Sequence, residues 1–482
     1  MALEPTPGFD LQPSAQQVPT ATNYITDFNF LNQYLPDTYE KEFERYGNRS
    51  ISSFLRLVGA EMPSNSDLIK WSEQGRLHVK YTGVITAAGA AATTNIFTVP
   101  AANANPTPFS ANNSMAIRPN QTVVLSRTVG AAGEFKGVVQ SVDLTTAPAA
   151  PTFTVAYYSL TGPLVAAGDE FTVFIYGSEF KKGTEGMDGS LEADNLFFEN
   201  KPIILKDKYS VSGSDMAQIG WVEVDTGAGT GYLWYMKSEH ETRMRFDDYL
   251  ETSMIEAVPA IQGSGADTFL GNGAAAGATG AGSEGVFYVV GERGNVWSGG
   301  NPVALADFDS VISRLDKQGA IEENVIFLNR QFGFDIDDML AAQNSYGAGG
   351  TSYGLFDNDE EMALNLGFSG FRRGYDFYKT DWKYLNDPTM RGGVSGTGSI
   401  NGLLVPAGST SVYDQVLGKN AKRPFLHVRY RASETEDRRY KTWITGSAGG
   451  ARTSDLDAME VNFLSERAVC TLGANNFVLF EN

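Results

Sequence analysis

The segment from residue 230 to 258 constrains the fold most, because it carries the pattern of a long amphipathic helix. Thr242, Phe246, Leu250, Met254 and Val258 recur at four-residue spacing and form one apolar stripe. Pro259 ends the helix. At 1.5 Å per residue the helix is about 40 Å long, which exceeds the width of a small domain. Further residues widen the stripe or lie off it: Tyr235, Tyr249 and Ala257 widen it, and Glu239, Arg243, Asp247 and Glu251 lie off it.

Composition limits the class of protein. The chain has 482 residues, a length that favours about three domains. Its net charge of -20 disfavours a sequence-reading DNA-binding protein, because neutralising phosphates requires a basic surface. No apolar run approaches the ~20 residues of a membrane span, and residues 1–22 lack the features of a secretory signal and are expected to form an arm. The single cysteine, Cys470, is expected to be a buried thiol in a protein folded in a reducing cytoplasm.

Before the long helix we expect three regions. Residues 1–80 should form an N-terminal arm and a helical segment. Residues 81–180 lose charge and gain Ala, Thr, Val, Pro and Gly, with short β-like runs at 121–126, 136–142, 152–158 and 170–176. This spacing predicts an inserted small β barrel or sandwich. Residues 181–226 are expected to form a long hairpin, with strands at 201–205 and 219–224 and a polar tip at 206–218, that needs another chain to cover it.

After the helix, residues 263–421 are expected to form a compact α/β layer. A Gly/Ala loop at 262–285 precedes a predicted strand at 286–290. Asn301 and Pro302 open a helix whose stripe is Leu305, Phe308, Ile312 and Leu315 and which Gly319 ends. A strand at 324–328, a helix at 335–343 and an aromatic strand at 375–382 follow. Residues 422–482 return to β structure, with strands at 425–431, 458–464, 467–472 and 477–480.

The sequence holds no convincing catalytic or cofactor motif. Gly280, Gly282 and Gly285 match a dinucleotide fingerprint, but the expected order of a strand before and a helix after is missing. His78, His240 and His427 have no histidine or cysteine partner nearby in sequence. The acidic cluster at 335–338 suits a helix start, and the cluster at 357–361 lacks the spacing of a calcium-binding loop. We therefore expect no enzyme, no metal and no cofactor.

The main basic segment spans residues 423–440. On a strand, His427, Arg429 and Arg431 would share one face, opposite Leu426, Val428 and Tyr430. Pairing with carboxylates of another subunit is favoured. A DNA-facing surface and a simply solvated strand face stay open as alternatives.

The order of these parts resembles the major capsid proteins of tailed bacteriophages, the fold type of phage Hong Kong 97. The stretch GDEFTVFIYGSEFKKGTEGMDGS resembles the start of the family's E-loop, NVIFLNRQFGFDIDDMLA an A-domain strand and helix, and VNFLSERAVCTLGANNFVLF the closing P-domain strands. Within the family the chain looks most like the capsid proteins of crAss-like podoviruses. The resemblance implies an α+β fold with an N-arm (1–80), an inserted β domain (81–180), an E-loop (181–226), a P-domain spine helix (227–262), an A domain (263–421) and a return to the P domain (422–482).

The resemblance also implies a function. Copies of the chain would self-assemble into hexamers and pentamers that form the icosahedral shell of a virion. The shell would enclose double-stranded DNA and contact it only non-specifically. Assembly would take place in the cytoplasm of a host bacterium. Portal, scaffold and decoration proteins would be further partners, and no membrane would be involved. Aromatic and basic residues near the hairpin and on the late basic strand are the predicted subunit contacts: Lys206, Lys208, Trp221, Tyr232, Trp234, Arg429 and Arg431.

Two other classes stay open. The β domain at 81–180 would also suit a head-decoration or tail protein of a virion, although such proteins are usually small and lack a long helix. A hydrolase using paired carboxylates would need Asp or Glu residues together in a pocket, and no suggestive spacing is present.

Overall fold

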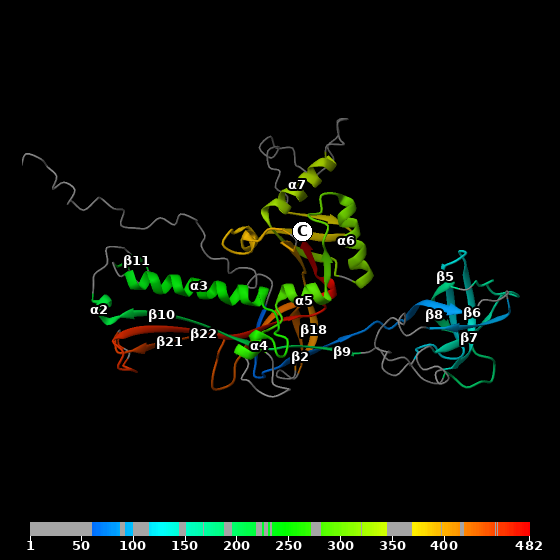
Figure 1. The fold of residues 1–482 in the computed structure, drawn as a ribbon, viewed down its shortest axis with the longest axis horizontal. Helices are drawn as coiled ribbons and strands as arrows, with labels where there is room; N and C mark the ends of the chain where they lie inside the picture. The colour runs from blue at the N-terminus through cyan, green and yellow to red at the C-terminus, as the bar shows by residue number, and fades with distance from the viewer. Residues whose placement is uncertain are drawn as a thin grey trace, which may run out of the picture. The chain divides into compact units, whose positions relative to one another are not determined.

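The computed structural model describes the greater part of the chain, and its elements are shown in Figure 1. The described residues are 60–86, 92–99, 115–143, 151–166, 168–187, 195–217, 224–225, 230–231, 234–270, 281–319, 321–344, 369–396, 398–414, 419–448, 450 and 452–482. The predicted N-terminal arm, and the part of the predicted helical segment that precedes residue 60, lie outside them. Two compact units are present, one formed by 207–245 with 443–462 and the other by most of the remaining described chain.

A closed six-stranded barrel confirms the predicted β domain. Its strands are β3 (Lys80–Thr86), β4 (Thr94–Thr98), β5 (Gln121–Val129), β6 (Glu134–Asp143), β7 (Thr152–Tyr157) and β8 (Glu170–Ser178), in the order β3-β4-β7-β6-β5-β8. The interior is aromatic: the Phe97 ring stacks on Phe153 at 5.5 Å and meets Phe171 edge-on at 5.4 Å. Alternate residues of each strand point inward, so short strands suffice to fill the barrel. The first two strands were not predicted.

One barrel glycine is required by close packing between strands. A Cβ atom on Gly137 would lie 2.4 Å from Cγ1 of Val155 and 2.6 Å from the carbonyl oxygen of Ala156. Both distances are shorter than van der Waals contact, and the second atom is backbone that cannot move aside. Gly137 therefore lets β6 and β7 approach each other.

A six-stranded mixed sheet forms the predicted α/β layer. Its order is β13 (Asn295–Trp297), β23 (Val478–Glu481), β17 (Ile400–Pro406), β14 (Glu323–Leu328), β16 (Tyr375–Asp381) and β15 (Gly370–Arg373). β14 runs parallel to β16 and antiparallel to β17. The central strands read as continuous apolar runs because both faces are covered.

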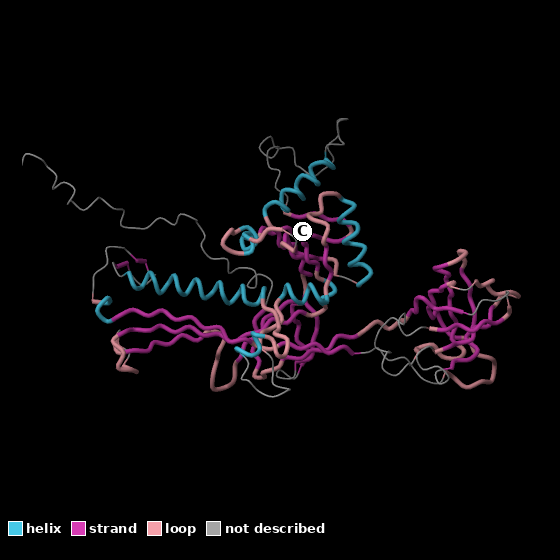
Figure 2. Tube along the Cα trace, in the orientation of Figure 1, coloured by secondary structure: helices cyan, strands magenta, loops and turns pink. Residues whose placement is uncertain are grey.

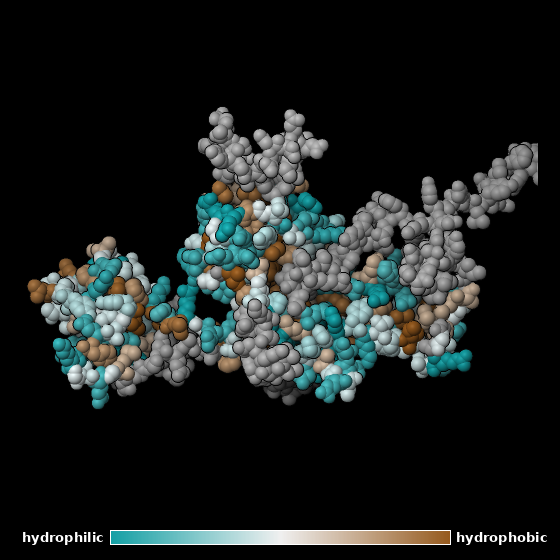
Figure 3. Space-filling view, turned by 180° about the vertical axis from the view of Figure 1, so that it is seen from behind, coloured by the Kyte–Doolittle hydropathy of each residue, from teal (hydrophilic) through white to brown (hydrophobic). Residues whose placement is uncertain are grey.

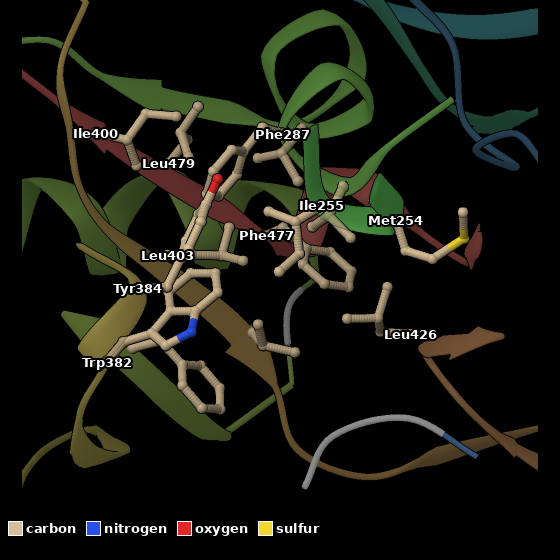
Figure 4. Packing of buried hydrophobic residues seen from close by; sticks show 14 of the residues in the cluster. Met254, Ile255, Phe287, Trp382, Tyr384, Ile400, Leu403, Leu426, Phe477 and Leu479 are labelled. Carbon is tan, nitrogen blue, oxygen red and sulfur yellow. The ribbon is translucent and has the colours of Figure 1, made fainter. Parts of the chain in front are cut away.

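Alternation along these strands separates two cores. On one face, helices α6 (Leu305–Gln318) and α7 (Arg330–Asn344) pack against Ile326, Leu328 and Leu404. Figure 2 shows the helices and strands of this part of the chain. On the other face, Phe327, Leu403 and Leu479 belong to a cluster that also includes aromatic and aliphatic residues from other helices and strands. Figure 4 shows this second cluster, which contains Met254, Ile255, Phe287, Trp382, Tyr384, Ile400, Leu426 and Phe477.

The predicted α6 stripe is largely confirmed. Phe308 and Leu315 are fully buried, Leu305 and Ile312 are partly buried, and Val311 adds to the buried set. Gly319 ends the helix with a φ of 74°, a left-handed conformation that favours glycine. α7 begins at Arg330, five residues earlier than predicted, since Asn329 accepts a hydrogen bond from the Phe332 amide at 2.8 Å.

A second sheet of five strands has the order β1 (Ala60–Ser64), β20 (Leu426–Arg431), β22 (Ala458–Thr471) and β10 (Ile203–Ser212), with β21 (Lys441–Gly446) also pairing with β22. β22 is one strand of 14 residues where two strands were predicted. The prediction also placed residues 477–480 with this sheet. They form β23 of the six-stranded sheet instead, because β23 pairs with β13 and β17.

The long helix is confirmed as α3 (Trp234–Glu256), the longest helix described. Phe246 and Met254 are fully buried, and Thr242 and Leu250 are nearly so. The stripe is rotated from the prediction, because Glu251 is buried whereas Tyr249 and Val258 are exposed. In the smaller unit, Arg245 pairs with Asp207 of β10 at 3.2 Å.

Three further predictions are wrong. Residues 60–80 form strands, not helix: β1, β2 (Ile69–Gln74) and the start of β3. Residues 286–290 form the first part of helix α5 (Val286–Arg293), where Val286, Phe287, Val289 and Val290 are buried at helical spacing. The polar tip at 206–218 is not a turn, because β10 continues to Ser212 and pairs with β22, and α2 (Gly213–Met216) follows.

Candidate assembly interface

A two-stranded ribbon carries the most exposed large apolar residue of the described strands, Phe197. β2 pairs antiparallel with β9 (Asn195–Asn200), and neither has another strand neighbour among the described strands. Phe197 is 73% exposed and Leu196 is 50% exposed. A ribbon of two strands with a free edge on each side is only marginally stable alone. Its outer edges and apolar side chains therefore suit contact with another chain.

The two strands of the ribbon flank the barrel in the sequence. β2 precedes the barrel strands and β9 follows them, so the whole barrel is inserted between the two paired strands. One ring on the ribbon is anchored: Trp71 lies 6.3 Å from Phe198, and the guanidinium of Arg293 lies 4.3 Å from the centre of the Phe198 ring. Phe198 is thus held within the chain, whereas its neighbour Phe197 points to solvent.

A second exposed apolar group lies at α4 (Gly265–Leu270), a short helix with no buried residue. Ile261, Phe269 and Leu270 are exposed there, with Phe269 at 86%. The prediction assigned this stretch to a Gly/Ala loop and named none of these residues. The signal in the sequence that could have indicated this exposed group was the apolar pair Phe269 and Leu270 beside a glycine-rich segment. Figure 3 shows that apolar patches elsewhere, as on the barrel, are interspersed with polar surface.

The basic segment 423–440 is mostly neutralised by carboxylates of its own chain. Arg431 bonds Asp67 and lies 3.7 Å from Glu466, which also pairs with Arg438 at 2.7 Å. Glu61 on β1 pairs with Arg439, and with Arg467 at 3.3 Å. The prediction assigned these carboxylates to another subunit, whereas for Arg431, Arg438 and Arg439 the structure supplies them from the same chain. These contacts fix β1 and the residues after it to the sheet that contains β20.

His427 and Cys470 lie opposite each other on β20 and β22 and are both buried. Burial lowers the pKa of His427 to about 4, with help from the positive charges of Arg429 and Arg423. Burial raises the pKa of the Cys470 thiol to about 12. A neutral imidazole and a protonated thiol are structural groups, as expected for Cys470. His427, Arg429 and Arg431 occupy alternate positions of β20 as predicted, but His427 is buried and is therefore not part of an exposed basic surface.

The predicted contact residues are scattered. Lys206 is exposed on β10, and Lys208 pairs with Glu460 at 2.9 Å. Trp221 and Tyr232 lie outside the described residues, and Trp234 is described only as the first residue of α3. Arg429 and Arg431 lie on β20. Among the described residues the lysines therefore share β10 and the arginines share β20, and all seven residues remain predicted contacts.

The candidate chemical sites give no active centre. In the described ranges no group of three or more His, Cys, Asp or Glu residues is placed to hold a metal ion. His78 and His240 are exposed. Asp335 accepts hydrogen bonds from Asn301 and Gln331, and Asp337 pairs with Lys379, so this acidic cluster is held within the fold. The cluster at 357–361 lies outside the described residues.

The glycine motif does open a helix, contrary to the prediction. Gly285 precedes α5, but the described elements before it are helices α3 and α4 and not the strand that a dinucleotide site needs. Gly282 has a φ of 85°, and a Cβ there would lie 2.4 Å from the carbonyl oxygen of Val258. These glycines therefore serve close packing against the end of α3. No helix in the described part of the chain has the length and apolarity required to cross a membrane.

No protein-family model and no curated protein matches the sequence. Solved structures show distant likeness. One from Microbacterium phage Oxtober96 is 9% identical with a TM-score of 0.39, covering 94% of this chain and 97% of that one. The capsid of an empty GTA particle is 9% identical with a TM-score of 0.34 and the same coverages. The capsid of cyanophage P-SCSP1u is 9% identical with a TM-score of 0.32, covering 64% of this chain and 80% of that one. TM-scores this low do not by themselves assign a fold or a function.

Proposed function

We propose that the chain is a shell subunit of a tailed-phage head, a structural protein whose copies associate with one another. The observation that carries the proposal is the β2–β9 ribbon, whose Phe197 and Leu196 are exposed and whose outer edges have no described strand partner. Such a segment gains order and buries apolar surface when another copy covers it. The order of parts in the sequence, with a long helix before an α/β layer, supports the same reading.

Within this proposal the β2–β9 ribbon, between whose strands the barrel is inserted in the sequence, is the E-loop. The prediction had assigned the E-loop to residues 181–226. α3 is the spine helix, and the six-stranded sheet with α6 and α7 is the A domain. Many weak contacts of this kind make a closed shell strong. Hexamers and pentamers enclosing double-stranded DNA, portal, scaffold and decoration partners, and assembly in a host bacterium belong to the same proposal, as does a relation to crAss-like phages.

The test is self-association measured by sedimentation velocity on the wild-type chain, Phe197→Ser and Leu160→Ser. Leu160 is exposed on the barrel and is the matched control, because both changes remove an exposed apolar side chain. We expect wild type and Leu160→Ser to form the same large species and Phe197→Ser to remain small with an unchanged circular dichroism spectrum. Equal association of all three would contradict the proposed role of the ribbon.

A second candidate is a head-decoration or tail structural protein, and the closed barrel is the observation that favours it. The two functions differ in what the chain binds. A decoration protein would remain small alone and bind preformed heads through the barrel, whereas a shell subunit would form particles from copies of itself.

A further inference from the structure

Arg429 differs from every other basic residue around it on the five-stranded sheet. It lies on β20 between Met62 of β1 and Ala468 of β22, on the same face as Arg431. The acceptor that its Nη1 atom has among the described residues is the weakly accepting Met62 sulfur, at 4.0 Å. Its Nε atom is buried and has no hydrogen-bond partner.

Four arginines near Arg429 pair with carboxylates of the described chain. Arg431 and Arg438 pair with Glu466, and Arg439 and Arg467 pair with Glu61. By contrast, no carboxylate of the described residues lies within ion-pair distance of Arg429. Arg423 adds a second positive charge nearby, because burial first and then the charge of Arg429 lower the pKa of the Arg423 guanidinium. Of Arg429 and these four arginines, Arg429 is therefore the one without a carboxylate partner among the described residues.

An unsatisfied guanidinium N–H in a partly buried place is costly, since water no longer solvates it fully. A planar guanidinium is matched by a carboxylate, which accepts two parallel N–H bonds. The chain carries 57 Asp and Glu residues against 37 Lys and Arg, so a second copy is the nearest rich source of carboxylates. The same net charge of -20 opposes a nucleic-acid phosphate as the occupant.

We propose that Arg429 binds a carboxylate of a second copy of this chain when subunits assemble. This inference rests on the proposed shell function and names one of its contacts. Arg431, two residues along the same strand, is the matched comparison, because its carboxylates Asp67 and Glu466 come from its own chain.

The first experiment measures assembly against subunit concentration for the wild type, Arg429→Gln, Arg429→Lys and Arg431→Gln. Arg429→Gln is expected to raise the concentration for half-assembly by about tenfold or more, because truncating one partner of a desolvated charge pair leaves the other unpaired. Arg429→Lys keeps the positive charge, so its concentration for half-assembly should lie between those of the wild type and Arg429→Gln. Arg431→Gln should instead lower the melting temperature of the unassembled chain, which Arg429→Gln leaves unchanged.

The second experiment locates the partner. Arg429→Lys particles assembled from equal amounts of ¹⁴N- and ¹⁵N-labelled chain are treated with a carbodiimide, which joins the introduced amine to a carboxylate in contact with it. Mixed-isotope peptides linking position 429 to an Asp or Glu support the inference. Links confined to one isotope, or normal assembly of Arg429→Gln, overturn it while leaving the shell function intact. A wild-type chain that never associates overturns both, and loss of duplex-DNA binding alone in Arg429→Gln would identify a phosphate instead.

Discussion

The Nη1 atom of Arg467 lies 3.3 Å from Oε1 of Glu61, although 406 residues separate the two along the chain. Arg467 also donates from Nε to the Ser465 hydroxyl and from Nη2 to the carbonyl of Arg439. Its side chain is only 7% exposed. One guanidinium therefore joins β1, β22 and the segment between β20 and β21.

Replacing this arginine should weaken the fold. We expect Arg467→Met to lower the free energy of unfolding by about 2–4 kcal/mol, because the Ser465 hydroxyl and Glu61 lose a buried charged partner. Urea denaturation of the unassembled chain measures the change. Arg372→Gln is the control, since its pair with Asp376 is solvent-exposed and such pairs contribute little. Equal effects of the two changes would contradict the assigned role.

Packing of the long helix gives a second prediction. Phe246 is fully buried, 5.5 Å from the Tyr440 ring and 5.7 Å from the Phe463 ring. Phe246→Ala should cost about 3–5 kcal/mol of unfolding free energy through lost contacts and a cavity. Tyr249→Ala on the exposed side of the same helix should change it little. Thermal unfolding followed by circular dichroism distinguishes the two, and similar melting temperatures would show that α3 is not fixed by this contact.

His427 gives a prediction on pH. Its folded pKa of about 4 lies below the ordinary histidine value of 6.5, so between these pH values the unfolded chain binds a proton that the folded chain does not bind. Stability from this group is therefore fully present above pH 6.5 and falls as the pH drops toward 4, by roughly 3 kcal/mol in total. His427→Gln should lose less stability than the wild type between pH 7 and pH 5. Parallel pH profiles for the two chains would refute this.

The thiol of Cys470 should be unreactive in the folded chain. Burial, which raises its pKa to about 12, keeps it protonated and out of reach of solvent. A thiol-specific chromogenic disulfide at pH 8 should react with it only after denaturant is added. Rapid reaction of the native chain would mean that β22 opens readily at this point.

The barrel should fold without the rest of the chain. Its hydrophobic core is drawn entirely from residues 79–173, and about 100 residues suffice for an independent domain. A fragment of residues 79–179 is expected to unfold cooperatively, and Phe97→Ala in the fragment should abolish or greatly weaken that transition. A non-cooperative melt of the unchanged fragment would show that the ribbon is needed for its stability.

Periodicity predicted the elements whose burial is one-sided. The apolar stripes of α3 and of α6, which ends at Gly319, could be predicted because polar residues interrupt the apolar ones at helical spacing. Four barrel strands could be predicted because turn residues separate them in the sequence. The fold class was thus largely accessible, and so was the burial of Cys470.

The remaining features depend on tertiary contacts. Residues 286–290 are β-branched and aromatic, which favours a strand, but Val286, Phe287, Val289 and Val290 are buried together only when they form a helix against the shared core. The pairing of β2 with β9 joins residues on either side of the barrel, and no local pattern encodes so distant a register. The ion pairs of Arg431 with Asp67 and of Arg439 with Glu61 could not be predicted for the same reason, since the partners lie far apart in the sequence.

Electron microscopy of the purified chain in negative stain, alone and after co-expression with neighbouring genes of its source genome, tests the shell function most directly. Closed shells, tubes, or rings of five and six copies are the expected result. A chain that stays monomeric or trimeric at high concentration under both conditions, with a folded circular dichroism spectrum, would contradict a shell subunit and favour a decoration or tail protein.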